Sequence, residues 1–155
     1  MTTTTHHAAG THCWSQLQTT DPEGAKRFYA GLFGWQAQNT PVGPRSITIF
    51  RKHDKAVGAL MNEAQGPAGW MTFIAVDDAD RIAERVSNAK GTVLMGPFTV
   101  ESNGRMAVFH DPTGAVFAVW QAGSKGGAEL LNEPDTMIWN ELLTNDTHRA
   151  GQFYD

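Results

Sequence analysis

An internal repeat constrains this chain most strongly. A shift of 125 positions aligns residues 14–30 with residues 139–155 and gives seven identities in seventeen positions. Each copy contains an alternating run that favours a β-strand, then an aspartate that can cap a helix, then a helical pattern. We interpret the chain as one complete domain followed by the opening of a second, truncated domain over residues 137–155.

The first copy has clear signals for both ends of its helix. Asp21 is the expected N-cap, Pro22 suits the first helical position, and Gly34 can end the helix in a left-handed conformation. An amphipathic helix as short as the second copy is not stable alone. The repeat predicts a strand over 137–144 and a helix capped by Asp146, both covered by a second domain of the same fold or by a homodimer through residues 137–155.

Composition narrows the class of protein. A net charge of −4 and a pI near 5.8 disfavour nucleic acid as a partner, because nucleic-acid-binding surfaces are usually basic. No apolar run approaches the length of a membrane span, and residues 1–10 lack the apolar core of a signal peptide, so no membrane partner is expected. The single cysteine, Cys13, excludes an internal disulfide and fits the cytoplasm. Residues 1–11 are polar and predict a disordered arm.

Turn signals divide the next segment into two similar units. After the first strand and helix, strands are predicted over 35–40, 46–51 and 56–61. After a loop at 62–69 the pattern restarts with a strand at 70–76, a helix capped by Asp77, and strands at 92–95, 105–110 and 115–121. The domain over 12–122 therefore contains two βαβββ modules, 12–62 and 69–122. A glycine-rich linker, 123–136, leads to the repeated segment.

These patterns resemble a known superfamily. The segments TTDPEGAKRFYAGLFGW, AVDDADRIAERV and above all GRMAVFHDPTGAVFAVWQ are similar to those of the vicinal oxygen chelate superfamily, which includes glyoxalase I, bleomycin-resistance proteins and extradiol dioxygenases. The tandem arrangement resembles the two-domain, glyoxalase-like subgroup. The resemblance implies an α+β fold in which paired βαβββ modules form a U-shaped mixed sheet with a concave pocket.

The chain departs from the resemblance at the positions that hold metal. Metal-dependent members place His, Gln or Glu at the start of each module's first strand and Glu in its last strand. Counting back from the capping aspartates assigns the strand starts to Trp14 and Trp70. The last-strand position that the resemblance implies falls on Ala118, and aligning GALM with FAVW gives Ala59 as its equivalent in the first module. None of the four offers a metal-binding atom, whereas zinc, iron or manganese needs three or four N, O or S ligands. We expect no metal and no other cofactor.

Aromatic side chains replace the metal ligands. Strand alternation, counted from the same positions, directs Trp14, Gln16, Trp70 and Thr72 to the concave face, and Met61 and Trp120 join them. Apolar surface with a few polar anchors is typical of a small-molecule pocket. In the alternative interpretation, the tryptophans fill the concave face and leave no cavity.

Few other residues offer chemistry. His110 is the best candidate for acid–base catalysis, although the pairs His53-Asp54 and His110-Asp111 also fit a purely structural role in hairpin turns. Gln16 is a candidate ligand anchor whose counterpart in the repeat is Glu141. Arg105 is a candidate contact for an anionic ligand group, or else a solvated surface arginine.

Two functions remain open at this point, besides the weaker idea that the missing second domain holds the chemistry. In the first, the chain is a metal-free binding protein that holds a small aromatic or polycyclic metabolite, as bleomycin-resistance relatives do. In the second, it is a metal-independent natural-product tailoring enzyme, an isomerase, lyase, cyclase or hydroxylase-like protein, in which His110 or Gln16 polarises the substrate.

Overall fold

The computed structural model describes residues 3–4, 6–61 and 67–155. The predicted loop at 62–69 lies largely outside these residues. The elements follow one another as β1 (His12–Gln18), α1 (Pro22–Phe33), β2 (Gln36–Val42), β3 (Arg45–Lys52), β4 (Lys55–Met61), β5 (Gly69–Ala75), α2 (Ala79–Asn88), β6 (Thr92–Val100), β7 (Gly104–His110), β8 (Val116–Ala122) and α3 (Thr147–Tyr154). The order βαβββ thus occurs twice before the tail.

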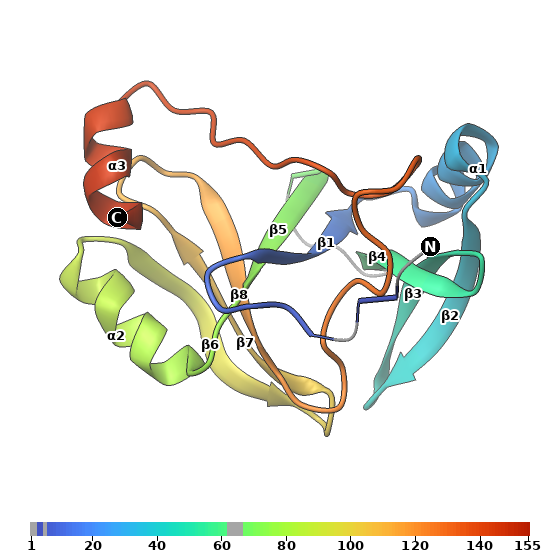
Figure 1. Ribbon diagram of the computed structural model, residues 1–155, viewed down its shortest axis with the longest axis horizontal. Coiled ribbons are helices and arrows are strands. Elements are labelled where there is room, and N and C mark those ends of the chain that lie inside the picture. Colours follow the sequence, from blue (N-terminus) through green and yellow to red (C-terminus); the bar gives the residue numbers. More distant parts are fainter. Residues whose placement is uncertain (1–2, 5, 62–66) are drawn as a thin grey trace.

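All of these strands form one curled sheet in the order β2-β3-β4-β1-β5-β8-β7-β6. Each module closes on itself, because β1 pairs in parallel with β4 and β5 pairs in parallel with β8. The two modules meet where β1 and β5 pair antiparallel at the centre of the sheet. The helices lie on the outer side of the curled sheet (Figure 1). The predicted α+β fold of paired βαβββ modules is confirmed.

The first helix begins and ends as its sequence predicts. The Asp21 carboxylate accepts a hydrogen bond from the Gly24 N–H at 2.8 Å, Pro22 stands at the start, and Gly34 ends the helix at φ 67°. The helix α2 begins one residue later than predicted. Its N-cap is Asp78, whose side chain accepts from the Arg81 N–H, and not Asp77.

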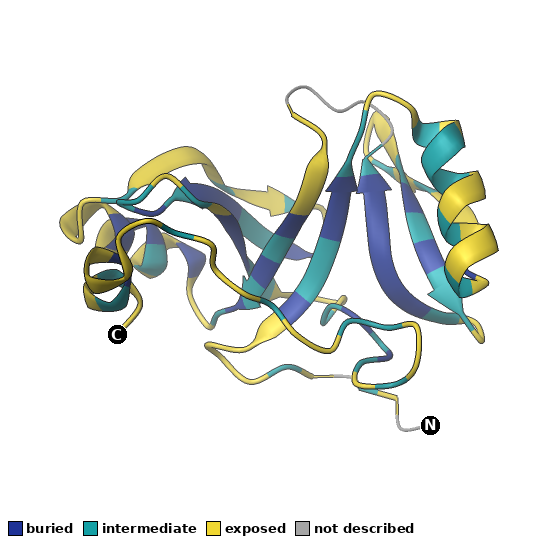
Figure 2. Cartoon of the chain, turned by 90° about the horizontal axis from the view of Figure 1, so that it is seen from above, coloured by how far each residue is buried: buried dark blue, intermediate teal, exposed yellow. Residues whose placement is uncertain are grey.

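The buried side chains form three clusters on the two faces of the sheet. On the outer face, one cluster packs under α1 around Phe50, and another packs under α2 around Phe109. The third cluster contains no helix residue and lies on the concave face; it includes Cys13 and Phe73. Figure 2 shows buried residues concentrated in the strands near the centre of the sheet.

The predicted arm and linker both contact the domain. In the arm, the Thr4 N–H donates to the Glu129 carbonyl at 2.9 Å and the Gly10 N–H donates to the Ala75 carbonyl at 2.9 Å. In the linker, Ala128 and Leu130 are buried. The sequence predicts disorder for residues 1–11, whereas the described part of this arm makes these defined hydrogen bonds.

The tail differs from its prediction in one half and agrees in the other. Asp146 caps α3 by accepting from the Arg149 N–H at 2.9 Å, as predicted. Residues 137–144, predicted as a strand, are not a strand, and the prediction is wrong for this chain. The segment instead runs along the outer side of the molecule between α3 and α1 (Figure 1). In the part of the chain that the structure describes, no strand pairs with this segment.

Candidate functional site

The register between β1 and β5 defines the concave face. Trp14 lies opposite Phe73, and Gln16 lies opposite Met71. Directly opposed residues point to the same face of a sheet, and Trp14 packs against the buried concave cluster that contains Phe73. The same register places Leu17 opposite Trp70 on the outer face. The inward-facing residues of β5 are therefore Met71 and Phe73.

We call seven of the inward-facing residues of β1, β4, β5, β7 and β8 the cup. They are mostly aromatic or sulfur-containing and carry no formal charge: Trp14, Gln16, Met61, Met71, Phe73, Met106 and Trp120. Gln16, Met71 and Phe73 are buried, while Trp14, Met61, Met106 and Trp120 are partly exposed. The cup thus presents a largely apolar surface that includes the Gln16 amide, accessible to solvent through its aromatic and sulfur groups.

Two predicted pocket residues lie outside the cup. The Trp70 indole N–H donates to the Tyr29 hydroxyl at 2.9 Å, and its ring meets Tyr29 edge-on, so it packs beneath α1. The Thr72 hydroxyl donates to the Asn140 side-chain oxygen of the tail at 3.1 Å. The prediction that Trp70 and Thr72 share the concave face with Trp14 is wrong, because the inward parity of β5 is that of Met71.

Contacts with two other segments fix the Trp120 indole. Its N–H donates to the Lys125 carbonyl at 2.8 Å, which ties the ring to the linker. Gly104 on the neighbouring strand β7 leaves room for the Trp120 ring, because a Cβ at position 104 would lie only 2.5 Å from the ring. A larger residue at position 104 would therefore push the indole away. The ring is held as a fixed part of the cup rather than as a mobile surface group.

His110 ends β7 and has the same parity as the inward-facing Val108. It lies opposite Val116 on one side and Thr92 on the other, which places it toward the rim of the concave face. Its neighbour Asp111 is 3% exposed and shapes the hairpin by accepting from the Thr113 N–H at 2.7 Å and the Ala115 N–H at 3.0 Å. Asp111 therefore has a structural role, and His110 remains the candidate for acid–base chemistry.

Arg105 points away from the cup. Its guanidinium makes two hydrogen bonds to the Asp80 carboxylate, at 2.7 and 2.8 Å, and a third to the Thr99 hydroxyl. The hydrogen bond from Arg105 holds the pKa of Asp80 below its ordinary value. Because Asp80 lies in the first turn of α2, this ion pair joins that helix to β7 on the outer side. Its geometry explains Arg105 without an anionic ligand.

The residues at the metal positions of the fold do not make a metal site. Trp14 lies seven residues before its cap Asp21, and the residue seven before Asp78 is Met71, so Met71 replaces Trp70 in the predicted set. Ala59 pairs with Gln16 and Ala118 pairs with Phe73, in equivalent places of the two modules. This set offers one thioether and no carboxylate or imidazole. No group of three His, Cys, Asp or Glu side chains that could hold a metal occurs among the described residues.

The remaining features of the surface lie elsewhere. One hollow lies between α2 and β6 and another between α2 and α3, both on the outer side. Cys13 is fully buried beside the cup, and burial raises the pKa of its thiol to about 12, which leaves the group protonated and unreactive. No helix in the described ranges is long and apolar enough to cross a membrane.

Sequence comparison places this geometry among known proteins. The profile of the Glyoxalase/Bleomycin resistance protein/Dioxygenase superfamily matches residues 4–119. CFP32 of Mycobacterium tuberculosis, which bears the name of a glyoxylase, is 42% identical over 153 residues, covering 94% of this chain and 59% of its own length. The anthracycline biosynthesis protein DnrV of Streptomyces peucetius is 38% identical over 167 residues, covering 97% of this chain and 61% of its own length. The chain thus spans about three fifths of these curated relatives.

Solved structures share the fold at lower identity. The Mn(II)-bound glyoxalase of Novosphingobium aromaticivorans superposes with a TM-score of 0.56 at 19% identity, over 77% of this chain and 41% of that one. A catechol 2,3-dioxygenase superposes with a TM-score of 0.55 at 16% identity, over 96% of this chain and 57% of that one. At such identities the likeness concerns the fold alone. The profile match and the two sequence relatives show that the chain belongs to the glyoxalase, bleomycin resistance protein and dioxygenase superfamily.

Proposed function

We propose that this chain is a metal-free binding protein that holds a flat aromatic or polycyclic metabolite against the cup. The observation that carries the proposal is the composition of the cup, in which Trp14, Trp120 and buried Phe73 occur with three methionines and without a formal charge. Aromatic and thioether groups suit stacking on flat apolar ligands. The Gln16 amide supplies one polar anchor, for instance for a carbonyl or hydroxyl of the ligand.

The relationship to an anthracycline biosynthesis protein supports a polycyclic ligand. An anthracycline is a suitable first probe, because its fused rings match the chemistry of the cup. We expect the probe to bind and its fluorescence anisotropy to rise on titration with the protein. Replacing Trp14 or Trp120 by alanine should weaken binding roughly tenfold or more, since a lost aromatic contact costs about 1 kcal/mol beyond the lost burial.

Trp70→Ala is the matched control. It removes an indole of the same size that lies on the outer face of the same sheet. Its probe affinity should stay within about twofold of the parent value, which is below the tenfold step of about 1.4 kcal/mol. Equal losses of probe affinity in Trp14→Ala and Trp70→Ala would show that the stability of the fold, and not stacking in the cup, controls binding.

The second candidate is a metal-independent tailoring enzyme that uses the same face. The observation that favours it is the position of His110, on the inward parity of β7 and partly exposed. A histidine there could transfer a proton to or from a bound substrate. His110→Ala separates the two functions: a binding protein keeps its probe affinity and shows no turnover in either form, whereas an enzyme loses turnover while binding persists.

A further inference from the structure

Residues 137–144 have the sequence of a central strand but no strand partners. Three repeat pairs allow a direct comparison of burial. Cys13 and Leu17 in β1 are 0% and 6% exposed, whereas their counterparts Ile138 and Leu142 are 67% and 41% exposed. Trp14 packs into the concave cluster, while its counterpart Trp139 is 76% exposed. The same kinds of side chain are thus covered in the first copy and uncovered in the second.

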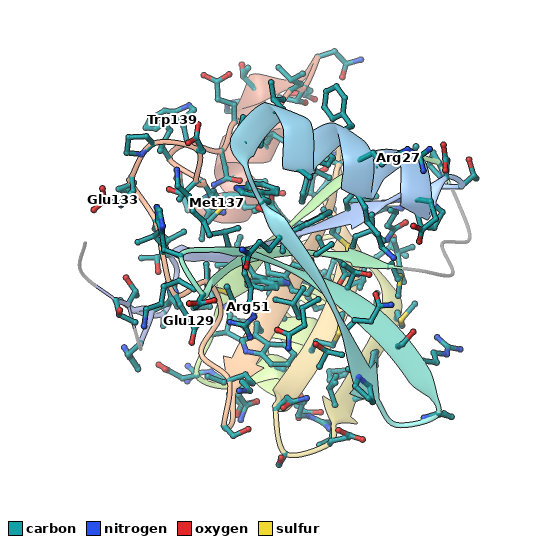
Figure 3. The ribbon with its side chains drawn as sticks, turned by 90° about the vertical axis from the view of Figure 1, so that its right-hand side faces the viewer. Arg27, Arg51, Glu129, Glu133, Met137 and Trp139 are labelled. Carbon is teal, nitrogen blue, oxygen red and sulfur yellow. The ribbon has the colours of Figure 1, made fainter. Side chains whose placement is uncertain are left out.

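The backbone of this segment is equally unpaired. Within the described ranges, residues 138–145 make no hydrogen bond from backbone to backbone. Side chains attach the segment to the sheet, through the Ser15 hydroxyl to the Met137 sulfur at 3.1 Å and through the Thr72 hydroxyl to Asn140. Figure 3 shows Met137 directed toward the domain and Trp139 at its outer margin. Exposed apolar surface of this extent costs roughly 25 cal/mol per Å².

The first copy shows which partners such a strand needs. β1 lies between β4, its parallel neighbour, and β5, its antiparallel neighbour. Cys13 is buried in the concave cluster, and Leu17 is buried in the cluster under α1. A second copy of this chain offers the same slot only if its own β1 leaves it, because β1 lies between β4 and β5. The partner of residues 137–144 is then another sheet of this fold, which has strands equivalent to β4 and β5 and a vacant place for β1 between them.

We propose that residues 137–155 form the first strand and helix of a second glyoxalase-like sheet, and that 137–144 becomes a β-strand only when that sheet is present. The helix cap at Asp146 is already formed, because it needs only local contacts. The strand is absent because, among the described residues, β1 already fills the place between β4 and β5. Within the completed sheet, Trp139 would take the place of Trp14, and Glu141 would put a carboxylate where the first cup has the Gln16 amide.

A tandem chain tests this proposal. Asp155 aligns with Ala30, so residues 31–122 of this same chain are appended directly after Asp155. We expect the amides of 138–143 to exchange at least about 100-fold more slowly than in the 155-residue chain, because strand pairing protects amides from exchange. Leu142→Asp, at the counterpart of buried Leu17, should remove this protection. Leu143→Asp, at the counterpart of partly exposed Gln18, should retain it.

A second variant tests the same segment without relying on the folding of the appended residues. Residues 12–30 are replaced, in the full chain, by a copy of residues 137–155, which has the same length. Cooperative unfolding of this variant, with a protected first strand, would show that the segment can occupy the slot between β4 and β5. Unprotected amides at 138–143 in the tandem chain, together with a non-cooperative replacement variant, would overturn the proposal.

Discussion

At the scale of single residues, Asp111 joins two parts of the chain that are far apart in sequence. One carboxylate oxygen accepts from the backbone and hydroxyl of Thr113, and the other accepts from the Tyr154 hydroxyl of α3 at 3.1 Å. Burial alone would raise the pKa of Asp111, but these hydrogen bonds hold it below the ordinary value. The sequence predicts the turn, because aspartate commonly stabilises turns. It gives no sign of the contact with Tyr154.

The Tyr154 contact predicts an alkaline transition. Burial raises the pKa of Tyr154 above its ordinary value of 10.0, and the nearby negative charge of Asp111 adds to the shift. A raised pKa means that the docked helix favours the neutral phenol, so this stabilisation is complete below the ordinary pKa and is lost as the pH rises through the folded value. Tyr154→Phe should cost about 1 kcal/mol at neutral pH, the usual contribution of one hydrogen bond. Unfolding in urea at several pH values measures both effects.

The parent and Tyr154→Phe should converge in stability as the pH rises above about 10, the ordinary value for tyrosine. Tyr29→Phe is the matched control, since this other tyrosine belongs to α1, where its hydroxyl accepts from the Trp70 indole and does not donate to Asp111. A constant difference between parent and Tyr154→Phe across the alkaline range would contradict the assignment.

At the scale of elements, one shifted helix cap explains the error in the predicted pocket. Asp77 and Asp78 are adjacent, and both can cap a helix, so local sequence does not choose between them. Counting from Asp77 selects Trp70, whereas counting from the true cap, Asp78, selects Met71. A shift of one residue exchanges the two faces of a strand. Ile74, which shares the parity of Trp70, packs against the α2 cluster on the outer face, in agreement with the parity set by Asp78.

The linker is a structural element in its own right. The Ala128 N–H donates to the Cys13 carbonyl at 2.8 Å, and the Glu129 N–H donates to the Ala56 carbonyl at 2.7 Å, so this segment bridges the first residues of β1 and β4. The linker is glycine-rich, and Gly127 is needed for the close approach of its backbone to β1. Gly127 has φ 128°, and a Cβ there would lie 2.5 Å from the Cys13 carbonyl oxygen.

Gly127→Ala should therefore destabilise the domain by about 1–3 kcal/mol, the usual cost of forcing a residue into an unfavourable backbone conformation. Thermal unfolding measures this as a lower Tm. Gly31→Ala is the matched control, because Gly31 lies in α1 with open space around its Cβ position, and alanine favours helix there. A Gly127→Ala chain as stable as its parent would mean that the linker does not hold this position in solution.

At the scale of the whole molecule, local sequence signals predict most elements of the fold. They do not predict which segments distant in sequence pair as strands. The caps Asp21 and Asp146 are confirmed, because a cap depends on three or four neighbouring residues. The segment 137–144 carries the pattern of β1 but does not form a strand, because a strand requires partners from elsewhere. The composition of the cup was predictable in kind, and its members on β5 and β7 follow only from the register of the complete sheet.

The fold as a whole is not expected to hold a metal on its concave face. The four equivalent places around the sheet, Trp14, Ala59, Met71 and Ala118, offer a single thioether, which is not a ligand set for a hard cation such as Mn²⁺. A ligand that binds only the folded state at 100 times its Kd stabilises it by about 2.7 kcal/mol. We expect saturating Mn²⁺, Zn²⁺ or Ni²⁺ to leave Tm unchanged, and elemental analysis to find no stoichiometric Zn, Fe, Mn or Ni. A metal-dependent rise in Tm that Met71→Leu abolishes would contradict this expectation and place a metal in the cup.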